Sequence, residues 1–180
     1  MKNDILVLVN EQDEILGYEE KIKTHLGEGK KHRAFSIFIF NSEGKLLIQK
    51  RAQGKMLWPG FWANTCCSHP RKDEEYLDVA KRRLKEEIGI KAELEYKFKF
   101  SYKVKYKDIG SENELCSVFF GKYESDEIKA NPEEIEEWKW VGIEELKQDI
   151  KNHPEIYAPW FKMEMEKIKI QDLRIKKIKS

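Results

Sequence analysis

"EEYLDVAKRRLKEEIGI", residues 74–90, combines a helical apolar pattern with a dense run of charges. Its apolar side chains recur every three to four residues, at Leu77, Ala80, Leu84 and Ile88. This is the spacing of one face of an α-helix, and Gly89 directly afterwards is a typical C-terminal stop. The stretch therefore predicts a helix over residues 73–88 that packs one face on a core.

Strand-like segments lie on both sides of this helix. Runs rich in β-branched and aromatic residues occur at 5–9, 34–40, 45–52, 94–106, 113–123 and 136–142. The turn "NSEG" joins the second and third runs, which predicts a β-hairpin. Two more helices are expected, at 143–152 and from Pro159 to about residue 178. Because strands and helices do not alternate strictly, we expect a single α+β domain over residues 1–180, a sandwich with a mixed sheet.

The composition is that of a globular protein with a densely charged exterior. The 180 residues are 40% hydrophobic and 37% charged, and the formal net charge of +1 gives no argument for a nucleic-acid partner. The basic tail at 172–180 is interpreted as the solvated end of a helix. The chain has no run of 18 apolar residues and no recognisable signal peptide, so we expect a cytoplasmic protein without membrane contact.

The stretch "NTCCSHP", residues 64–70, brings two cysteines and a histidine together. In the cytosol the three cysteines stay reduced, and adjacent cysteines seldom bridge each other, so a disulfide is the weakest interpretation. Cys66 and Cys116 are interpreted as packing residues. Cys67 remains open, because it can be a metal ligand or, paired with His69, a nucleophile for acyl transfer.

Carboxylates near both ends of the predicted helix raise a second question. Glu74, Glu86 and Glu87 can form a solvated face paired with Arg82 and Arg83. They can also hold Mg²⁺, which binds carboxylates and completes its shell with water and substrate phosphates. On composition alone the solvated face is the simpler interpretation.

Histidines and a second carboxylate pair offer ligands for a different metal. His25, His32 and His69 lie in short polar segments where we expect accessible side chains, and imidazole suits Zn²⁺, Mn²⁺ or Fe²⁺. In an extended strand Glu112 and Glu114 share one face, so a single element can supply two more ligands. Simple alternation in a half-exposed strand explains the same pair, and both interpretations stay open.

Together these segments resemble one family. Residues 68–90 look like a Nudix box, G-x5-E-x7-R-E-U-x-E-E-x-G-U, in which U is aliphatic. The matching positions are Glu74, Arg82, Leu84, Glu86, Glu87, Gly89 and Ile90. Ser68 replaces the first glycine and Arg83 replaces the glutamate after the arginine. These departures argue against ordinary Nudix hydrolysis.

The departures fit the type 1 isopentenyl-diphosphate isomerases, which use a Nudix fold without hydrolysing the diphosphate. "WANTCCSHP" resembles the motif around the catalytic cysteine of that family, and "ENELC" resembles the motif around its catalytic glutamate. "H-x6-H" and "APWF" also occur in the family's order. The resemblance runs from about residue 5 to at least residue 161, and it implies a Nudix-type α/β/α sandwich with a mixed sheet.

The resemblance also implies roles for individual positions. Cys67 and Glu114 correspond to the acid/base pair, and Tyr102 and Trp160 to residues that line the isoprenoid cavity, with Tyr106 as a possible register alternative to Tyr102. The implied diphosphate contacts are Lys21, Arg51, Lys55 and Arg83. The implied ligands of a divalent metal are His25, His32, His69, Glu112 and Glu114. Glu87 and the main-chain carbonyl of Cys67 correspond to ligands of the Mg²⁺ that accompanies the diphosphate.

The implied activity is the interconversion of isopentenyl diphosphate and dimethylallyl diphosphate in isoprenoid biosynthesis. Its cofactors are Mg²⁺ with the substrate and a second ion, Mn²⁺, Zn²⁺ or Mg²⁺, at the His/Glu site. Two alternatives remain. A Nudix diphosphate hydrolase keeps the Mg²⁺ carboxylates but gives no role to Cys67 or the histidines. A non-catalytic interaction domain with a structural zinc site usually needs more thiolates.

Overall fold

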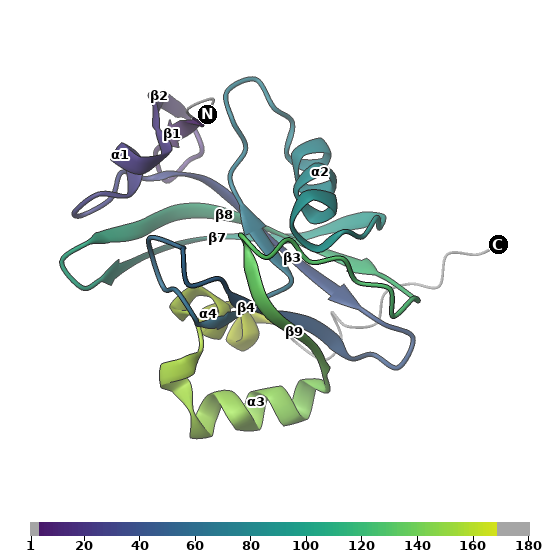
Figure 1. Cartoon of the computed structure of the whole chain (residues 1–180). Coiled ribbons are helices and arrows are strands. Elements are labelled where there is room, and N and C mark those ends of the chain that lie inside the picture. The colour runs from purple at the N-terminus through teal and green to yellow at the C-terminus, as the bar shows by residue number, and fades with distance from the viewer. Residues whose placement is uncertain (1–3, 169–180) are drawn as a thin grey trace.

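A computed structural model describes residues 4–168 of the chain. The strands are β1 (Ile5–Val9), β2 (Ile15–Glu20), β3 (His32–Phe40), β4 (Leu46–Arg51), β5 (Trp62–Ala63), β6 (Cys66–Ser68), β7 (Leu94–Tyr106), β8 (Gly110–Lys122) and β9 (Ile135–Val141). The helices are α1 (Lys21–His25), α2 (Tyr76–Ile88), α3 (Ile143–Asn152) and α4 (Pro159–Lys167), with a 3₁₀ turn at Pro154–Ile156. The elements form an α+β arrangement (Figure 1).

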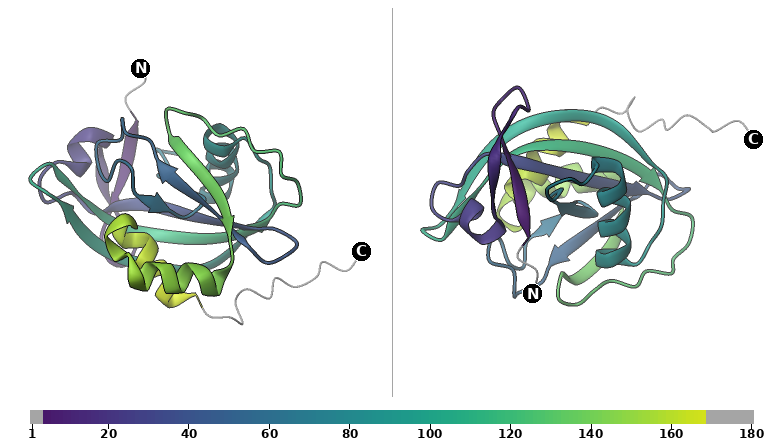
Figure 2. Two further views of the ribbon diagram at one scale, coloured as in Figure 1. Left: turned by 60° about the horizontal axis from the view of Figure 1, so that its bottom comes forward. Right: turned by 90° about the horizontal axis from the view of Figure 1, so that it is seen from above.

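The sheet is organised around β3. This strand runs parallel to β8, from His32 opposite Glu114 to Phe40 opposite Lys122, and antiparallel to β1, β4 and β6. The sheet is therefore mixed, as predicted. β7 and β8 form a long, curved hairpin along one side of the molecule, and β9 pairs with β4 (Figure 2). The predicted hairpin of β3 and β4 is confirmed by the pairing of Phe40 with Leu46.

Two hydrophobic cores lie on opposite faces of this sheet. Alternate side chains of β3 enter different cores, because successive strand residues point to opposite faces. Phe35, Ile37 and Ile39 pack with the apolar face of α2. Ala34, Phe38 and Phe40 pack with residues of α3 and α4. The helices thus form outer layers on the two faces of the sheet (Figure 1), the α/β/α sandwich expected from the resemblance.

The predicted central helix is present, with two differences. It begins at Tyr76 rather than residue 73, because Asp73 has a positive φ of 65° and Arg71–Glu74 form a turn closed by the Arg71 main-chain N–H on the Glu74 carboxylate. Leu77, in the first helical turn, was predicted to face the core but is 40% exposed. Val79 packs in the core instead. Gly89 ends the helix in the left-handed conformation, as expected.

The C-terminal helix is shorter than predicted within the described residues. α4 ends at Lys167, and Ile168 is extended. The remainder of the predicted helix and the basic tail lie outside the described residues. β2 and α1 were not predicted, because residues 15–25 carry no clear apolar period.

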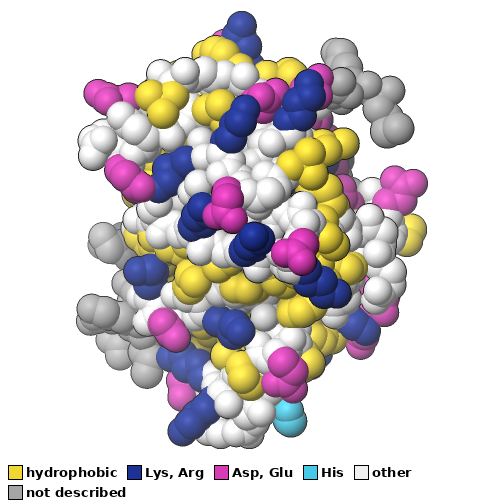
Figure 3. Space-filling view, turned by 90° about the vertical axis from the view of Figure 1, so that its left-hand side faces the viewer, with side chains coloured by type: hydrophobic (Ala, Val, Ile, Leu, Met, Phe, Trp, Pro, Cys, Tyr) yellow, Lys and Arg dark blue, Asp and Glu magenta, His cyan; other side chains and the backbone are white. Residues whose placement is uncertain are grey.

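The surface carries charges of both signs. In Figure 3, Lys and Arg side chains alternate with Asp and Glu side chains between smaller apolar areas, as the near-zero net charge implies. No helix within residues 4–168 is long and apolar enough to cross a membrane.

Candidate active site

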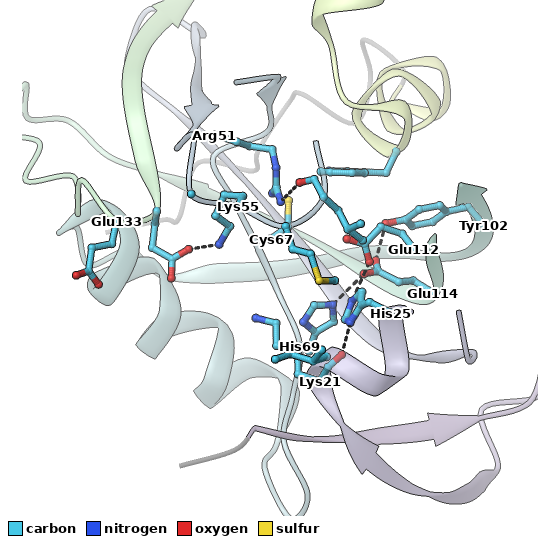
Figure 4. Close-up of a pocket in the computed structure, with 16 residues that line it drawn as sticks. Lys21, His25, Arg51, Lys55, Cys67, His69, Tyr102, Glu112, Glu114 and Glu133 are labelled. Atoms are coloured by element: carbon cyan, nitrogen blue, oxygen red, sulfur yellow. Dashed lines mark hydrogen bonds and ion pairs between the residues drawn. The ribbon is translucent and has the colours of Figure 1, made fainter. Parts of the chain in front are cut away.

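A cavity of about 360 Å³ opens between the N-terminal helix, the β4–β5 loop, the sheet and α4. This volume lies in the range of small-molecule sites. Figure 4 shows acidic and imidazole side chains gathered at one side, Lys55 and Glu133 at the other, and Cys67 between them. The predicted site residues that line it are Lys21, His25, Arg51, Lys55, Cys67, His69, Tyr102, Glu112, Glu114 and Trp160.

Three imidazoles and two carboxylates, the histidine–carboxylate cluster, meet at one end of this cavity. Its members are His25, His32, His69, Glu112 and Glu114, and their ligand atoms all lie within 4.8 Å of one another. The predicted divalent-metal residues therefore come together as one group. The histidines come from the end of α1, the start of β3 and the residue after β6, whereas both carboxylates come from β8.

Strand register and one glycine assemble the cluster. The parallel pairing of β3 with β8 sets His32 directly opposite Glu114. The end of α1 approaches β8 where Leu26 bridges to Gly110. A Cβ at Gly110 would lie 2.3 Å from the His25 carbonyl oxygen, so only glycine permits this approach.

The ligand atoms are oriented for a shared cation. The Nδ1 atoms of His25 and His32 lie 2.6 and 2.7 Å from the carbonyl oxygens of Lys21 and Lys30, and these contacts turn each Nε2 toward the cluster. Such outer hydrogen bonds are typical of metal-ligating histidines. His32 Nε2 is buried without a hydrogen-bond partner among residues 4–168, and Glu112 Oε2 lies 3.0 Å from His25 Nε2. Mixed nitrogen and oxygen donors of this kind fit a divalent metal.

The electrostatic environment keeps one of these imidazoles in its ligating form. Burial, together with the neighbouring His32 and His25, holds the pKa of His69 well below its usual value. A neutral imidazole has the free lone pair that a metal requires.

The expectation of accessible histidines is wrong, because His25 and His32 are buried. The half-exposed strand proposed as an alternative for Glu112 and Glu114 is also wrong, since both side chains are buried.

Glu114 is shared between this cluster and the cavity. Its Oε1 lies 2.9 Å from His69 Nε2, and Tyr102 donates a hydrogen bond of 2.6 Å to its Oε2. Tyr102 stands opposite Glu114 in the β7–β8 pair. Tyr106 instead packs against Trp58, with ring centroids 5.0 Å apart. Of the two tyrosines, Tyr102 is the one among the residues that line the cavity.

Cys67 reaches the same cavity from β6, which pairs with β3 on the edge opposite to β8. β6 pairs with β3 so that Cys67 lies opposite Ser36, whereas Glu114 comes from β8 on the other side. Burial raises the pKa of the Cys67 thiol, so it is protonated at neutral pH. Cys66 and Cys116 are fully buried, one in each core, as expected for packing residues, and all three cysteines are free.

Trp160 forms the apolar wall of the cavity. It is buried at the start of α4, crosses Trp58 at 86° with ring centroids 5.3 Å apart, and lies under the Arg51 guanidinium at 5.2 Å. Arg51 also donates hydrogen bonds of 3.0 and 2.9 Å to the carbonyl oxygens of Trp58 and Leu57. These bonds hold the guanidinium at the cavity wall.

The remaining predicted diphosphate contacts form a cationic group. Lys21 lines the cavity, and burial together with the nearby Lys55 and Arg83 lowers its pKa. Lys55 pairs with Glu134, and Arg83 lies 3.2 Å from the same carboxylate. Arg83 does not itself line the cavity. A concentration of half-buried positive charge in and beside a cavity favours an anionic ligand group.

The three carboxylates considered for Mg²⁺ differ in their surroundings: Glu74 lies in the turn before α2, whereas Glu86 and Glu87 lie within the helix. Glu74 and Glu86 both pair with Arg82, at 2.7 and 3.1 Å, in the solvated arrangement. Glu87 is different: it is buried and pairs with Arg83 at 2.5 Å. Burial raises the pKa of Glu87. Glu87 is not among the residues that line the cavity.

Three residues near the cavity were not predicted from the sequence to have a role. Glu134 joins Lys55 to Arg83, Asn64 contacts both Cys67 and Trp160, and Glu164 is a fully buried carboxyl on α4. Glu164 follows Trp160 by four residues, a helical spacing that could have placed both on one face. Glu134 lies in the acidic run "PEEIEE", where composition singles out no position.

Comparison with known proteins shows the family of this chain. The family model of the NUDIX domain matches residues 30–162. Isopentenyl-diphosphate Delta-isomerase 1 of Photorhabdus laumondii is 47% identical over 161 residues, which cover 88% of this chain and 91% of the relative. The chain belongs to the isopentenyl-diphosphate Delta-isomerase family. A second member, isopentenyl-diphosphate Delta-isomerase 1 of Aromatoleum aromaticum, is 44% identical and covers 92% of both chains.

Solved structures agree on the fold of this family member. DR0079 from Deinococcus radiodurans superposes with a TM-score of 0.76 at 20% identity, covering 91% of this chain and 98% of the other. The MutT protein of Methanosarcina mazei gives a TM-score of 0.61 at 22% identity and covers 76% of this chain and 91% of the other. At these identities the likeness shows the Nudix fold alone.

Proposed function

We propose that this protein interconverts isopentenyl diphosphate and dimethylallyl diphosphate, with Cys67 and Glu114 as the acid/base pair. The observation that carries the proposal is the placement of these two groups. They come from strands on either side of β3 and reach the same cavity, one beside the basic residues and the other inside the histidine–carboxylate cluster.

The reaction needs two such groups. Moving the double bond requires a proton added at C4 and a proton removed at C2, each by a side chain within hydrogen-bond reach. An unactivated alkene is a weak base, so it needs a positioned acid. Its protonation at C4 gives a tertiary carbocation, which water would capture. The buried indole of Trp160 excludes water from this end, and its ring face stabilises a positive charge by about 2 kcal/mol or more. Tyr102, bonded to Glu114, assists proton movement at that carboxyl.

The basic residues have a different task. Lys21, Arg51 and Lys55 would hold the diphosphate away from the reacting carbons, so that its binding energy orients the short hydrocarbon chain. Arg83 supports them through Glu134. Glu87 and the Cys67 main-chain carbonyl offer hard oxygen donors for Mg²⁺.

The histidine–carboxylate cluster would hold the second divalent ion, Mn²⁺, Zn²⁺ or Mg²⁺. When bound, that ion supplies a local positive charge that alters the proton affinity of Glu114. Of the alternatives, the hydrolase has less support, because Glu74 and Glu86 are engaged by Arg82 and Arg83 replaces a glutamate of the Nudix box. A structural zinc site does not account for a carboxylate that also faces a cavity. We also place the protein in the cytoplasm, where its three free cysteines stay reduced.

Incubation with isopentenyl diphosphate, Mg²⁺ and Mn²⁺ in deuterated water tests the proposal. We expect dimethylallyl diphosphate, with deuterium at the carbons that exchange protons. Absence of both product and deuterium from metal-replete protein would contradict the isomerase assignment. Orthophosphate release from nucleoside diphosphates without isomerisation would favour the hydrolase instead.

A further inference from the structure

Asn64 lies behind the cavity, between β5 and β6, and contacts two residues that line it. Its side chain is 0% exposed and does not belong to the cavity wall. The amide Oδ1 accepts a hydrogen bond of 2.9 Å from the Cys67 thiol and one of 3.3 Å from the Trp160 indole N–H. The proposed acid/base thiol and the proposed cation-stabilising ring therefore meet at one oxygen atom.

The other end of this amide is fixed to the sheet. Nδ2 donates hydrogen bonds of 2.9 Å to the Cys66 carbonyl and 3.3 Å to the Ile37 carbonyl. A primary amide has two N–H donors and an oxygen with two lone pairs, so its full capacity is used. The orientation of the amide is also determined, because backbone carbonyls only accept and an indole N–H only donates. Oδ1 must face Cys67 and Trp160.

This arrangement ties together three elements that meet only in the folded chain. Asn64 connects β3 through Ile37, β6 through Cys66 and Cys67, and α4 through Trp160. The start of α4 has a second, independent attachment, since the Ala158 main-chain N–H donates a hydrogen bond of 2.9 Å to the Trp62 carbonyl. Loss of the Asn64 amide therefore removes the restraint on the thiol and the indole, together with the bonds to the Cys66 and Ile37 carbonyls, while the Ala158 bond still attaches the start of α4.

We propose that Asn64 is a positioning residue that holds the Cys67 thiol and the Trp160 indole in one fixed relation to the substrate. This inference rests on the isomerase function proposed above. Proton transfer by Cys67 is productive only while the carbon that becomes positive lies against the indole. The thiol and the indole must therefore keep a fixed distance and orientation to each other. Displacement of a reacting group by about 1 Å can cost about 100-fold in rate.

Asn64→Ala removes the oxygen that accepts from both the Cys67 thiol and the Trp160 indole. Thr65→Val is the matched control. Thr65 is equally buried in the same segment and makes two hydrogen bonds, to the Leu47 carbonyl and from the Ile39 N–H, but contacts neither Cys67 nor Trp160. We expect kcat of Asn64→Ala to fall about 100-fold with KM within about threefold. Thr65→Val should keep kcat within about threefold of the wild type while losing comparable stability.

A second measurement does not depend on activity. In ¹⁵N-labelled protein, the Trp160 indole N–H resonance, assigned with Trp160→Phe, should shift upfield in Asn64→Ala and stay in place in Thr65→Val. If the alanine variant does not fold, Asn64→Asp, which has the same size, carries both measurements. Its second oxygen cannot donate to the Cys66 and Ile37 carbonyls, so kcat and the indole signal should again change.

A folded Asn64 variant with wild-type kcat and an unmoved indole signal would overturn the inference. A fall in kcat shared equally by Thr65→Val would also overturn it, because the effect would then be general destabilisation. Failure of the wild type to isomerise would instead overturn the proposed function, and the indole signal would still decide whether the hydrogen bond exists.

Discussion

Glu164 should make the stability of this protein depend on pH in a direction opposite to that of most carboxylates. The side chain is fully buried on α4, its Oε1 lies 3.9 Å from Cys116 Sγ, and its Oε2 has no hydrogen-bond partner among residues 4–168. Burial, reinforced by the charge of Glu114, raises the pKa of Glu164 to about 8. At neutral pH the folded protein therefore holds a proton here that the unfolded chain has released.

The size of the effect follows from the two pKa values. Between the ordinary value of 4.5 and the folded value of about 8, the folded state binds the extra proton, so the free energy of unfolding falls as the pH rises. One pKa unit corresponds to about 1.4 kcal/mol. At pH 7 the cost is about 3 kcal/mol, and it vanishes below pH 4.5, where both states are protonated.

Glu164→Gln removes this proton uptake and keeps the shape of the side chain. Its buried N–H groups cost about 1–3 kcal/mol at every pH. The free energy of unfolding of Glu164→Gln minus that of the wild type should therefore increase by more than 2 kcal/mol between pH 5 and pH 7, because only the wild type loses stability over this range. Urea unfolding followed by tryptophan fluorescence, in metal-free buffer at pH 5, 6, 7 and 8, measures that difference.

Glu166→Gln is the control, because Glu166 is exposed on the same helix. Its unfolding free energy should stay within about 0.5 kcal/mol of the wild type at each pH. Parallel pH profiles for Glu164→Gln and the wild type would refute the reasoning, since they would mean that Glu164 is ionised in the folded protein or reaches solvent.

Three further outcomes are expected. Cys67→Ala should lower kcat at least about 100-fold, the usual contribution of an acid/base group, and near-wild-type isomerisation would remove Cys67 from the mechanism. Lys21→Met should raise KM for isopentenyl diphosphate about tenfold or more while stability stays level or increases, because Lys21 is a half-buried cation without an ion pair among the described residues. Chelation of divalent metal should lower the melting temperature of the wild type, and His25→Ala should abolish this response, as followed by calorimetry with and without chelator.

Local patterns were sufficient for most of the secondary structure. The alternation of 94–106 predicted β7 with its observed bounds, and the apolar spacing of 143–152 did the same for α3. Such periodicity reports which side chains meet water and which do not, and that distinction is local. β2 and α1 lack a clear period, and they take their structure from pairing with β1 and from the close approach to Gly110.

The residues singled out by the motifs converge on one cavity. The cysteine, the three histidines and the two strand carboxylates all lie in or beside it. Their burial was not predicted, because a short polar segment looks solvent-exposed until another element covers it. β8 and α1 cover these segments from other parts of the chain.

The relations between these groups belong to the folded chain. His69 meets Glu114 across 45 positions of sequence, and Asn64 meets Trp160 across 96. Such contacts depend on the register of β3 with β6 and β8 and on the docking of α4, which no local pattern encodes. The roles of Asn64, Glu134 and Glu164 follow from these contacts, because each residue type acquires its function only from the neighbours that packing brings to it.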